Sequence, residues 1–472
     1  MKYISTRGQV EAVDFQDAVL MGLADDGGLM IPRAIPDATD QLKAWANLSY
    51  PGLAFEILRR FTRDMPEHDL RLLIEKTYGP SYFINDTEPE DKRDVAPVVQ
   101  VGDLFVLELW HGPTLAFKDV ALQLLGNLFE YILERRGGKL NILGATSGDT
   151  GSAAIYGCRG RRGIDIFVMH PHGRVSPIQE HQMTSVPDAN VHNIAVEGSF
   201  DDCQNIMKSL AGDLIFKRQY SLGAVNSVNW ARVLAQIVYY FYGAFNVLRR
   251  TGAKAVRVSV PTGNFGDVLA GWYAMKMGAP IRQLILATNE NDILARFYNT
   301  GEYSLGEKVV QTLSPSMDIQ VASNFERYLY YRVGGNARRL REMMAEFSRT
   351  GSLRVKPGEN GLVDADFAAA RADTQQVLET IETYYKQHEY VFDPHTACGV
   401  AAAEQLKDRD LPILCLATAH PAKFPAAIAQ ATGRDDLARH PAIDAMMHLP
   451  TRCKILPNSK QAVREYIIET LG

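Results

Sequence analysis

The chain has 472 residues, of which 50 are Lys or Arg and 55 are Asp or Glu, so that its formal net charge is −5. This length exceeds what one hydrophobic core usually organises, and we expect two or three domains. The balanced charge, without a block of basic residues, argues against a nucleic-acid partner and favours a small-molecule ligand.

The composition also bears on membranes and on the cellular compartment. The longest uncharged run, Val233 to Leu248, is too short to span a bilayer, so it is predicted to be a buried helix. The first residues lack the apolar stretch of a secretory signal. The cysteines have no paired metal spacing and stand at Cys158, Cys203, Cys398, Cys415 and Cys453. These features predict a cytoplasmic protein with reduced thiols and no membrane partner.

The order of helical and apolar patterns predicts the fold class. Residues 1–95 are expected to form an N-terminal domain, with helices near Phe15–Gly22 and Leu53–Thr62. From about residue 100, apolar runs of strand length recur, most of them followed by helical patterns. These runs are Leu104–Trp110, Leu140–Ala145, Ile164–Met169, Val256–Val260, Ile281–Ala287 and Ile413–Ala417. Because strands joined by helical crossovers pair in parallel, we predict an α/β fold with ligands at the carboxyl ends of the strands.

A mostly helical insertion is expected at about residues 300–390. The charged stretches Asn336–Arg349 and Asp364–Gln387 within it have helical character. No catalytic spacing stands out in this insertion, and we interpret it as structural.

Lys118 stands where a lysine is unexpected, at or just before the first turn of a predicted helix. The amino end of a helix carries partial positive charge, which disfavours a cation by a few tenths to about 1 kcal/mol. Among Pro113, Leu115 and Phe117 the amine would be desolvated and its pKa lowered, as an amine that attacks an aldehyde requires. A solvated surface lysine is the commoner alternative.

The loop after Leu140–Ala145 has the composition of an anion site at the amino end of a helix. Its candidate residues are Thr146, Ser147, Gly148, Asp149 and Thr150. Such a loop could hold a carboxylate or a phosphate, although the carboxylate of Asp149 opposes an anion directly beside it. Helix capping by Ser147 or Asp149 is the alternative.

A second such loop follows Val256–Val260 and contains Thr262, Gly263, Asn264, Phe265, Gly266 and Asp267. Two glycines let the backbone curl so that successive amide groups point inward, and the following helix adds its positive end. A phosphate could therefore be held without lysine or arginine. An ordinary turn between strand and helix is the alternative.

Other catalytic schemes lack their parts. The sequence has no GxGxxG or GxxxxGK[ST] nucleotide loop, no HExxH and no GxSxG. His170, His172 and His181 could suggest a metal, but the cluster is incomplete and loop or core histidines are commoner. No metal site is predicted.

Six segments taken together resemble the threonine synthase family, in its longer subgroup of fungal and enterobacterial type. They are HGPTLAFKD, ATSGDTGSAA, HPHGRVSPIQEHQMT, NSVNWARVLAQ, PTGNFGD and LATAHPAKFP, and YISTRG and GLADDGGLMIP extend the likeness almost from end to end. The resemblance implies a fold type II, tryptophan synthase β-like enzyme with mostly parallel sheets in two subdomains. Residues 131–230 would form the small α/β subdomain, and residues 96–130 with 231–472 the large cofactor-binding domain.

The resemblance also implies a cofactor and its contacts. Lys118 matches the lysine that carries pyridoxal 5'-phosphate as a Schiff base. The loop Gly263–Gly266 matches the cradle of the cofactor's phosphate, flanked by Thr262 and Asp267. Thr418 matches the hydroxyl residue expected near the pyridine nitrogen.

The loop Thr146–Thr150 matches the segment that holds the substrate's carboxylate and approaches the cofactor's ring oxygen. Many relatives of the wider fold type have Asn where this chain has Asp149. A carboxylate facing a phenolate oxygen is repulsive unless it is protonated or turned away. We therefore do not expect the usual ring-oxygen contact at Asp149.

The implied reaction converts O-phospho-L-homoserine and water to L-threonine and phosphate, with Lys118 as the base that moves protons at the α- and β-carbons. Candidates for binding the leaving phosphate are Arg232, with Asn229 and Ser176, because a guanidinium can hold a phosphate through two hydrogen bonds. Arg232 could instead cover apolar surface with its stem.

Three alternatives stay open. Another enzyme of the same fold type, such as a serine or threonine dehydratase or a sulfhydrylase, is one of them, and a dehydratase would release a keto acid. A non-catalytic relative would keep the cofactor without turnover, and a plain α/β binding protein would have no cofactor. The resemblance favours a monomer, with a dimer as the alternative.

Overall fold

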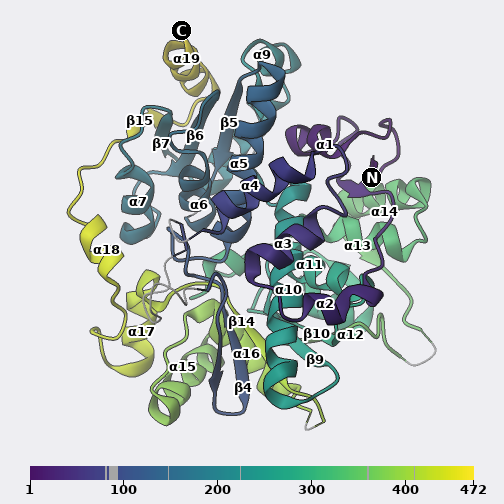
Figure 1. The fold of residues 1–472 in the computed structure, drawn as a ribbon. Coiled ribbons are helices and arrows are strands. Elements are labelled where there is room, and N and C mark those ends of the chain that lie inside the picture. Colours follow the sequence, from purple (N-terminus) through teal and green to yellow (C-terminus); the bar gives the residue numbers. More distant parts are fainter. Residues whose placement is uncertain (80–81, 84–93, 147, 224, 359–360, 409) are drawn as a thin grey trace.

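Residues 1–79, 82–83, 94–146, 148–223, 225–358, 361–408 and 410–472 are described by the computed structural model drawn in Figure 1. Two main sheets organise this part of the chain, with the strand orders β13-β10-β9-β14-β4-β3 and β15-β7-β6-β5-β8. The strands of the larger sheet are β3 (Val98–Val101), β4 (Leu104–Glu108), β9 (Val256–Pro261), β10 (Ile281–Thr288), β13 (Phe367–Arg371) and β14 (Ile413–Ala417). Those of the smaller sheet are β5 (Leu140–Ala145), β6 (Ile164–Pro171), β7 (Val191–Glu197), β8 (Leu222–Gly223) and β15 (Lys454–Pro457).

Neighbouring strands in both main sheets pair in parallel, except for the hairpin of β3 and β4. The central strands β9 and β14 are buried along their whole length, because helices cover both faces of the sheet. The α/β fold predicted from the sequence is confirmed. All six predicted strands are present, as β4, β5, β6, β9, β10 and β14.

Helices cover both sheets. Those around the larger sheet are α10 (Trp230–Thr251), α11 (Gly266–Lys276), α12 (Ile293–Thr300), α15 (Thr374–His388) and α16 (Pro394–Gln405). Those around the smaller sheet are α6 (Asp149–Cys158), α7 (Pro177–Thr184), α8 (Phe200–Ala211), α9 (Leu214–Gln219) and α19 (Lys460–Leu471). Helix α5 (Lys118–Arg136) packs against both α10 and α6 and so joins the two halves. The predicted buried helix is α10, in which Trp230 to Phe241 are all buried.

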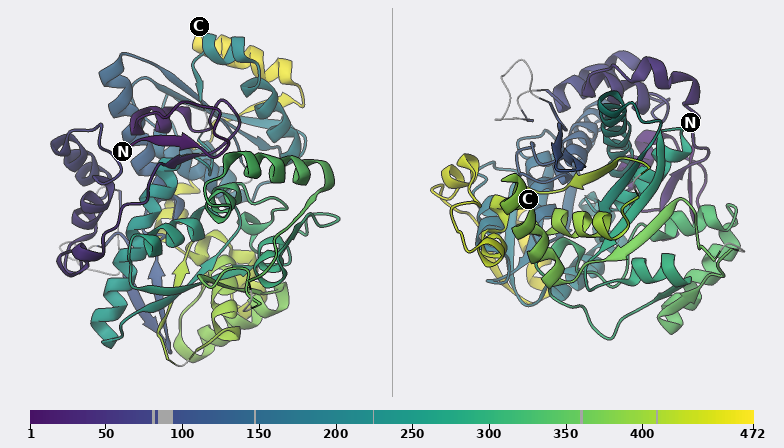
Figure 2. Two further views of the ribbon diagram at one scale, coloured as in Figure 1. Left: turned by 90° about the vertical axis from the view of Figure 1, so that its right-hand side faces the viewer. Right: turned by 90° about the horizontal axis from the view of Figure 1, so that it is seen from below.

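The N-terminal region flanks these layers. Its elements are β1 (Tyr3–Ser5), α1 (Phe15–Met21), β2 (Met30–Pro32), η1 (Thr39–Gln41), α2 (Leu42–Trp45), α3 (Tyr50–Leu58) and α4 (Glu67–Thr77). It lies beside α13 (Phe325–Arg332) and α14 (Ala337–Thr350), as Figure 2 shows. There Arg327 donates to the carbonyl of Met30 at 2.9 Å, and Arg7 forms an ion pair with Glu326 at 3.0 Å.

The remaining elements lie in two segments. Residues 302–354 add β11 (Glu302–Ser304), η3 (Pro315–Met317) and β12 (Ser352–Arg354). The stretch after β14 adds η4 (Pro421–Lys423), α17 (Pro425–Thr432) and α18 (Pro441–Met446), and then continues to the smaller sheet (Figure 1).

Two expectations differ from the structure. The stretch Asp364–Gln387, predicted to be helical, contains strand β13 before α15 begins. Its sequence FAAAR has weak strand propensity, and it becomes a strand because it pairs with the edge of β10. The end of the chain also returns to the smaller sheet, where β15 pairs with β7, although residues 231–472 were assigned to the large domain. The other domain boundaries stay a prediction.

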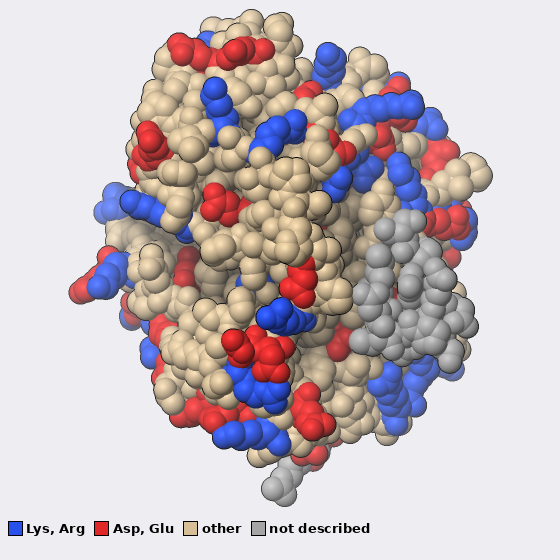
Figure 3. Space-filling view, turned by 90° about the vertical axis from the view of Figure 1, so that its left-hand side faces the viewer, with Lys and Arg blue, Asp and Glu red and all other residues tan. Residues whose placement is uncertain are grey.

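Three surface and composition features complete the fold. None of the described helices is long and apolar enough to cross a bilayer. Four of the five free cysteines are buried, and Cys453 is exposed. On the face drawn in Figure 3, acidic and basic side chains lie interspersed.

Helices α5 and α6 touch backbone to backbone through two glycines. A Cβ atom on Gly126 would lie 1.8 Å from the carbonyl oxygen of Gly157, and one on Gly157 would lie 2.4 Å from that of Leu122. Helix α5 begins with Lys118 and α6 begins with Asp149, each about two turns from its glycine. The close contact therefore sets how near these two charged side chains can come.

Gly126→Ala should lower the free energy of unfolding by about 1–3 kcal/mol, because the added methyl group forces the two helices apart. The measurement is the midpoint of urea unfolding. Gly138→Ala is the matched control and should be nearly neutral, since its nearest neighbour would be a Leu133 methyl at 3.4 Å. An unchanged midpoint for Gly126→Ala would contradict the backbone contact.

Candidate active site

A cavity lies where loops at the carboxyl ends of the larger sheet meet the first turns of α5 and α6. Strand β9 leads into the loop Thr262–Phe265, and β14 leads into Thr418. This is the edge at which open α/β sheets bind ligands. The cavity is lined by Phe117, Lys118, Asp149, Thr150, Ser227, Arg232, Gln236, Pro261, Thr262, Gly263, Asn264, Phe265, Gly266, Asp267, Ser316, Met317, His395, Thr418 and Ala419.

The amine of Lys118 faces this cavity from the amino end of α5, with 7% of the residue exposed. Its Nζ donates to Ser316 Oγ at 3.4 Å and lies 3.6 Å from Asp149 Oδ2. The same atom lies 4.9 Å from the centre of the Phe117 ring. The side chain is therefore held between an apolar ring on one side and polar partners on the other.

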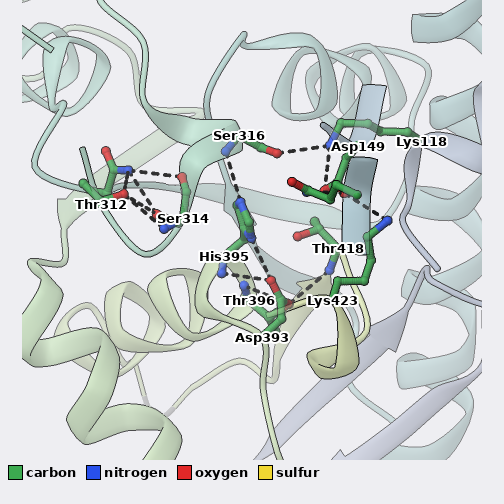
Figure 4. A network of polar contacts seen from close by, with 12 residues as sticks. Lys118, Asp149, Thr312, Ser314, Ser316, Asp393, His395, Thr396, Thr418 and Lys423 are labelled. Atoms are coloured by element: carbon green, nitrogen blue, oxygen red, sulfur yellow. Dashed lines mark hydrogen bonds and ion pairs between the residues drawn. The ribbon is translucent and has the colours of Figure 1, made fainter. Parts of the chain in front are cut away.

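Asp149 and Lys423 form a buried ion pair beside Lys118 (Figure 4). Asp149 is 4% exposed and Lys423 is 1% exposed. Lys423 Nζ lies 2.9 Å from Asp149 Oδ1 and donates to the carbonyl of Thr114 at 2.6 Å and to Gln182 Oε1 at 3.0 Å. The three hydrogens of this ammonium group therefore all have acceptors.

The clustered charges shift the proton affinity of Asp149 and Lys118. Burial alone would raise the pKa of Asp149, but Lys423 and Lys118 outweigh it and hold the pKa well below its usual range. Burial lowers the pKa of the Lys118 amine; Asp149 opposes this effect, whereas Lys423 and Arg232 add to it. The site thus places an ionised carboxylate beside an amine that loses its proton more readily than a solvated lysine.

The loop before α11 brings backbone amides to the amino end of the helix. Gly263 has no room for a side chain, because a Cβ atom there would lie 2.6 Å from the carbonyl oxygen of Ser316. The residue in the left-handed conformation is Phe265, with φ of 63°, and not either glycine. Its ring packs edge-on against Phe325 at 5.4 Å, which holds a backbone conformation that costs about 1–2 kcal/mol.

Two buried side chains reach the cavity with polar atoms that have no hydrogen-bond partner among the described residues. They are Arg232, through Nε and Nη1, and Asp267, through Oδ2. Burial lowers the pKa of Arg232 to about 10 and raises that of Asp267 to about 6. Asp267 Oδ1 accepts from the hydroxyls of Tyr239 at 2.5 Å and Tyr240 at 2.8 Å. An unpartnered buried polar group costs about 1–3 kcal/mol, so such groups at a cavity point to a ligand.

A chain of hydrogen bonds supports another wall of the cavity (Figure 4). Asp393 accepts from His395 Nδ1 at 2.8 Å and from the hydroxyl of Thr396. His395 Nε2 accepts from the amide of Ser316 at 3.2 Å, which fits a neutral imidazole with its proton on Nδ1. Thr396 Oγ1 accepts from the amide of Thr418 at 3.1 Å. One buried carboxylate therefore fixes both Ser316 and Thr418.

Most residues singled out in the sequence line this cavity, but several do not. Asn229 begins α10 and is used within the fold, since it accepts from the amide of Ala231 at 3.0 Å and donates to the carbonyl of Val19 at 2.9 Å. Ser176 is an exposed cap of α7 that accepts from the amide of Gln179 at 3.3 Å. Neither side chain belongs to the cavity lining.

Of the segment Thr146–Thr150, too, only some residues line the cavity. Asp149 and Thr150 line the cavity, whereas Thr146 and Gly148 do not. Thr146 Oγ1 accepts from the amides of Gly148 at 3.0 Å and Gly151 at 2.9 Å, so it braces the loop from inside. Ser147 lies outside the described residues.

Sequence reasoning missed several residues of the site, among them Lys423, His395 and Ser316. Lys423 stands in the segment LATAHPAKFP, where a lone lysine among small apolar residues was an available signal. Ser316 falls in the 300–390 stretch, which therefore contributes to the cavity. Nothing in the local sequence marks His395, because its position depends on the neighbouring Asp393 and on a distant loop.

The histidines considered for a metal serve other contacts. His170 Nε2 lies 3.6 Å from Cys453 Sγ, and His181 Nε2 lies 3.1 Å from the carbonyl of Leu449. Within the described ranges, no group of three or more His, Cys, Asp or Glu side chains is arranged to hold a metal ion.

Comparison with known families defines the class to which this site belongs. Residues 93–363 match the family described as pyridoxal-phosphate dependent enzyme. Residues 2–78 match the threonine synthase N terminus, and residues 396–467 match the threonine synthase C-terminal family. The three matches together cover most of the chain.

Individual relatives make the assignment more specific. A threonine synthase of Pseudomonas aeruginosa is 45% identical over 99% of this chain and 98% of its own, and one of Schizosaccharomyces pombe is 44% identical over 91% and 88%. The crystal structure of pyridoxal-phosphate-bound threonine synthase from Brucella melitensis has a TM-score of 0.92 and 44% identity, covering 100% of this chain and 99% of that one. The chain belongs to the threonine synthase family.

The described residues fit pyridoxal phosphate. Lys118 and Arg232 line the cavity, and two nitrogen atoms of the Arg232 guanidinium have no partner among the described residues, which suits the negative charge of a phosphate group. The amides at the start of α11 can hold a phosphate, and the buried amine of Lys118 can bond an aldehyde carbon.

Asp267 gives stability a testable pH dependence. Its pKa of about 6 in the folded chain lies above the ordinary value of 3.8, so folding takes up a proton between about pH 4 and 6. The free energy of unfolding therefore falls as pH rises through this window, by about 3 kcal/mol in total. Asp267→Asn should raise the urea midpoint of the cofactor-free chain at pH 7.5, with a gain that vanishes near pH 4.

Asp25→Asn, at an exposed position, is the control and should change neither midpoint. A gain of equal size at both pH values would show that Asp267 is not held in a neutralised state by burial.

Proposed function

We propose that this chain converts O-phospho-L-homoserine and water into L-threonine and phosphate. The observation that carries the proposal is the buried amine of Lys118, which faces a cavity with two candidate phosphate sites. One is the amide cradle at the start of α11, and the other is the unpartnered guanidinium of Arg232. A cofactor and a substrate that each carry a phosphate require two such sites.

The cofactor would be held by three parts of the chain. The amine of Lys118 would bond its aldehyde carbon, the amides of Gly263–Gly266 would bind its phosphate, and Thr418 would lie near its ring nitrogen. When bound, pyridoxal phosphate supplies an electron sink for the α-carbon of an amino acid. Asp149 is paired with Lys423, which offsets the repulsion that a lone carboxylate would exert on a ring oxygen.

Proton transfer in the reaction falls to Lys118. Its Nζ removes a proton from the α-carbon of the substrate and, once it has released that proton, removes one from the β-carbon, after which phosphate leaves the γ-carbon with its bonding electrons. The γ-carbon and the α-carbon then each take up a proton, water adds its hydroxyl group at the β-carbon, and the other proton of water goes to the departing phosphate. The lowered pKa of this amine suits the role, because a base must be free of its proton before it acts.

Arg232 is the candidate for holding the substrate's phosphate. Its planar guanidinium presents several donors in a fixed geometry, and two of its nitrogen atoms have no partner among the described residues. Asn229 and Ser176 do not enter this proposal, because their side chains are bonded to backbone groups away from the cavity.

The proposal also covers the cellular compartment and the oligomeric state. Composition and family resemblance favour the cytoplasm and a monomeric enzyme, with a dimer as the alternative. No nucleic acid or membrane takes part.

The decisive experiment incubates the purified protein with O-phospho-L-homoserine and measures threonine and phosphate together. Equal amounts of both products are expected. Lys118→Ala should lower the rate by at least about 100-fold, since a positioned base contributes about 10²–10⁴ and this residue also anchors the cofactor. Release of a keto acid would favour the dehydratase alternative.

Lys254→Ala, at an exposed lysine, should keep the full rate and serves as the control. No phosphate release by the unaltered chain, or full activity of Lys118→Ala, would overturn the proposed function.

Arg232→Met should lower kcat/KM for O-phospho-L-homoserine by about 10–100-fold, because a hydrogen bond to a charged group contributes about 1.5–3 kcal/mol. Cofactor affinity, measured by absorbance titration, should stay nearly unchanged. Arg250→Met, at the exposed end of the same helix, is the matched control. A large loss of cofactor affinity would instead assign Arg232 to the cofactor's phosphate.

A further inference from the structure

Lys423 is the most deeply buried cation near Lys118, yet its own hydrogens are all engaged. We propose that Lys423 is a positioning residue whose fixed charge occupies Asp149 and so prevents that carboxylate from holding a proton on the amine of Lys118. This inference rests on the proposed role of Lys118 as the reactive amine, but not on the turnover of any substrate.

Two lysine side chains contact the carboxylate of Asp149 at different distances. Lys423 Nζ lies 2.9 Å from Asp149 Oδ1, whereas Lys118 Nζ lies 3.6 Å from Oδ2 of the same residue. Gln179 Nε2 also donates to Asp149 Oδ1, at 2.8 Å. Asp149 is therefore stabilised as an anion by Lys423 and Gln179, and its contact with Lys118 is the longest of the three.

Hydrogen bonds hold Lys423 in place, so that its short contact with Asp149 is maintained. It closes the short turn η4, and its ammonium is tied to the carbonyl of Thr114 and to the side chain of Gln182 as well as to Asp149. A group with three acceptors and almost no exposed surface has no freedom to carry protons. Its contribution to the reaction is a constant positive charge.

The other ionisable groups near Lys118 come from three further helices. Arg232 on α10 adds a second positive charge, and Asp267 on α11 is largely neutralised by burial below pH 6. His395 on α16 accepts from the amide of Ser316 through Nε2, which fits a neutral ring. Among the cations of this group, Lys118 and Lys423 contact Asp149 directly.

Removing Lys423 should therefore change the charge of Lys118. In Lys423→Met, the carboxylate of Asp149 keeps Lys118 as its main cationic partner, and an ion pair of this kind retains the proton on the amine. The repulsion between the two ammonium groups is lost as well. Both effects raise the pH at which Lys118 becomes a free amine.

The test follows how fast the full-length, cofactor-free chain recaptures pyridoxal phosphate, by stopped-flow absorbance at a series of pH values. The rate tracks the fraction of Lys118 without its proton. The midpoint of the rate profile should move upward by about one pH unit or more in Lys423→Met, so that recapture below the midpoint slows roughly tenfold. Pyridoxal, which lacks the phosphate, should give the same shift.

A second pair of variants, both carrying Asp149→Asn, keeps the test decisive if Lys423→Met folds poorly. Asp149→Asn and the double variant Asp149→Asn with Lys423→Met bury no unpaired carboxylate. The double variant should still titrate at higher pH than Asp149→Asn alone, because only the like-charge repulsion from Lys423 differs between them.

Lys276→Met is the matched control, since Lys276 also pairs with a carboxylate, Asp366 at 2.6 Å, but Asp366 does not line the cavity whereas Asp149 does. It should leave the midpoint unchanged. If removal of Lys423 leaves the midpoint in place or lowers it in both backgrounds, the inference is wrong. Midpoints that shift as expected in a chain that forms no threonine would overturn only the proposed function.

Discussion

Burying an ion costs several kcal/mol unless an opposite charge and hydrogen bonds compensate it, and three separate elements must meet before the charges around Lys118 are compensated. Lys118 begins α5, Asp149 begins α6 of the smaller sheet, and Lys423 follows the last strand of the larger sheet. The ion pair of Asp149 and Lys423 is therefore also a tie between the two sheets. Loss of either charge would affect the fold and the reactive amine together.

Other parts of the site position the charged side chains of Lys118, Asp149 and Lys423. The glycine contact between α5 and α6 lets Lys118 and Asp149 approach, and a residue with a Cβ atom in place of Gly126 could not allow it. Asp393 orders Ser316 and Thr418 through His395 and Thr396, and Ser316 accepts from Lys118. The unpartnered guanidinium of Arg232 and the backbone amides at the start of α11 match a cofactor that brings a phosphate group.

The sequence predicted what depends on local pattern. Strands such as β9 and β14 are continuous apolar runs, because both of their faces are covered, and Lys118 stood out against the helix dipole. It could not predict β13, whose strand form comes from pairing with β10, nor the meeting of Asp149 with Lys423, which lie far apart in the chain. Nor could it predict the contacts of Asn229 with Ala231 and Val19, because the contact with Val19 joins residues that are far apart in the chain. Family resemblance supplied the cofactor, which no spacing in the chain could specify alone.

The return of the chain to the smaller sheet has a consequence for how the enzyme is made. Lys423 and β15 both lie in the final part of the sequence, whereas Lys118, Asp149 and β7 precede them by more than two hundred residues. A growing polypeptide folds from its amino end while it leaves the ribosome. Until β15 has been synthesised, the nascent chain therefore has an uncovered edge at β7, a state that invites aberrant strand pairing.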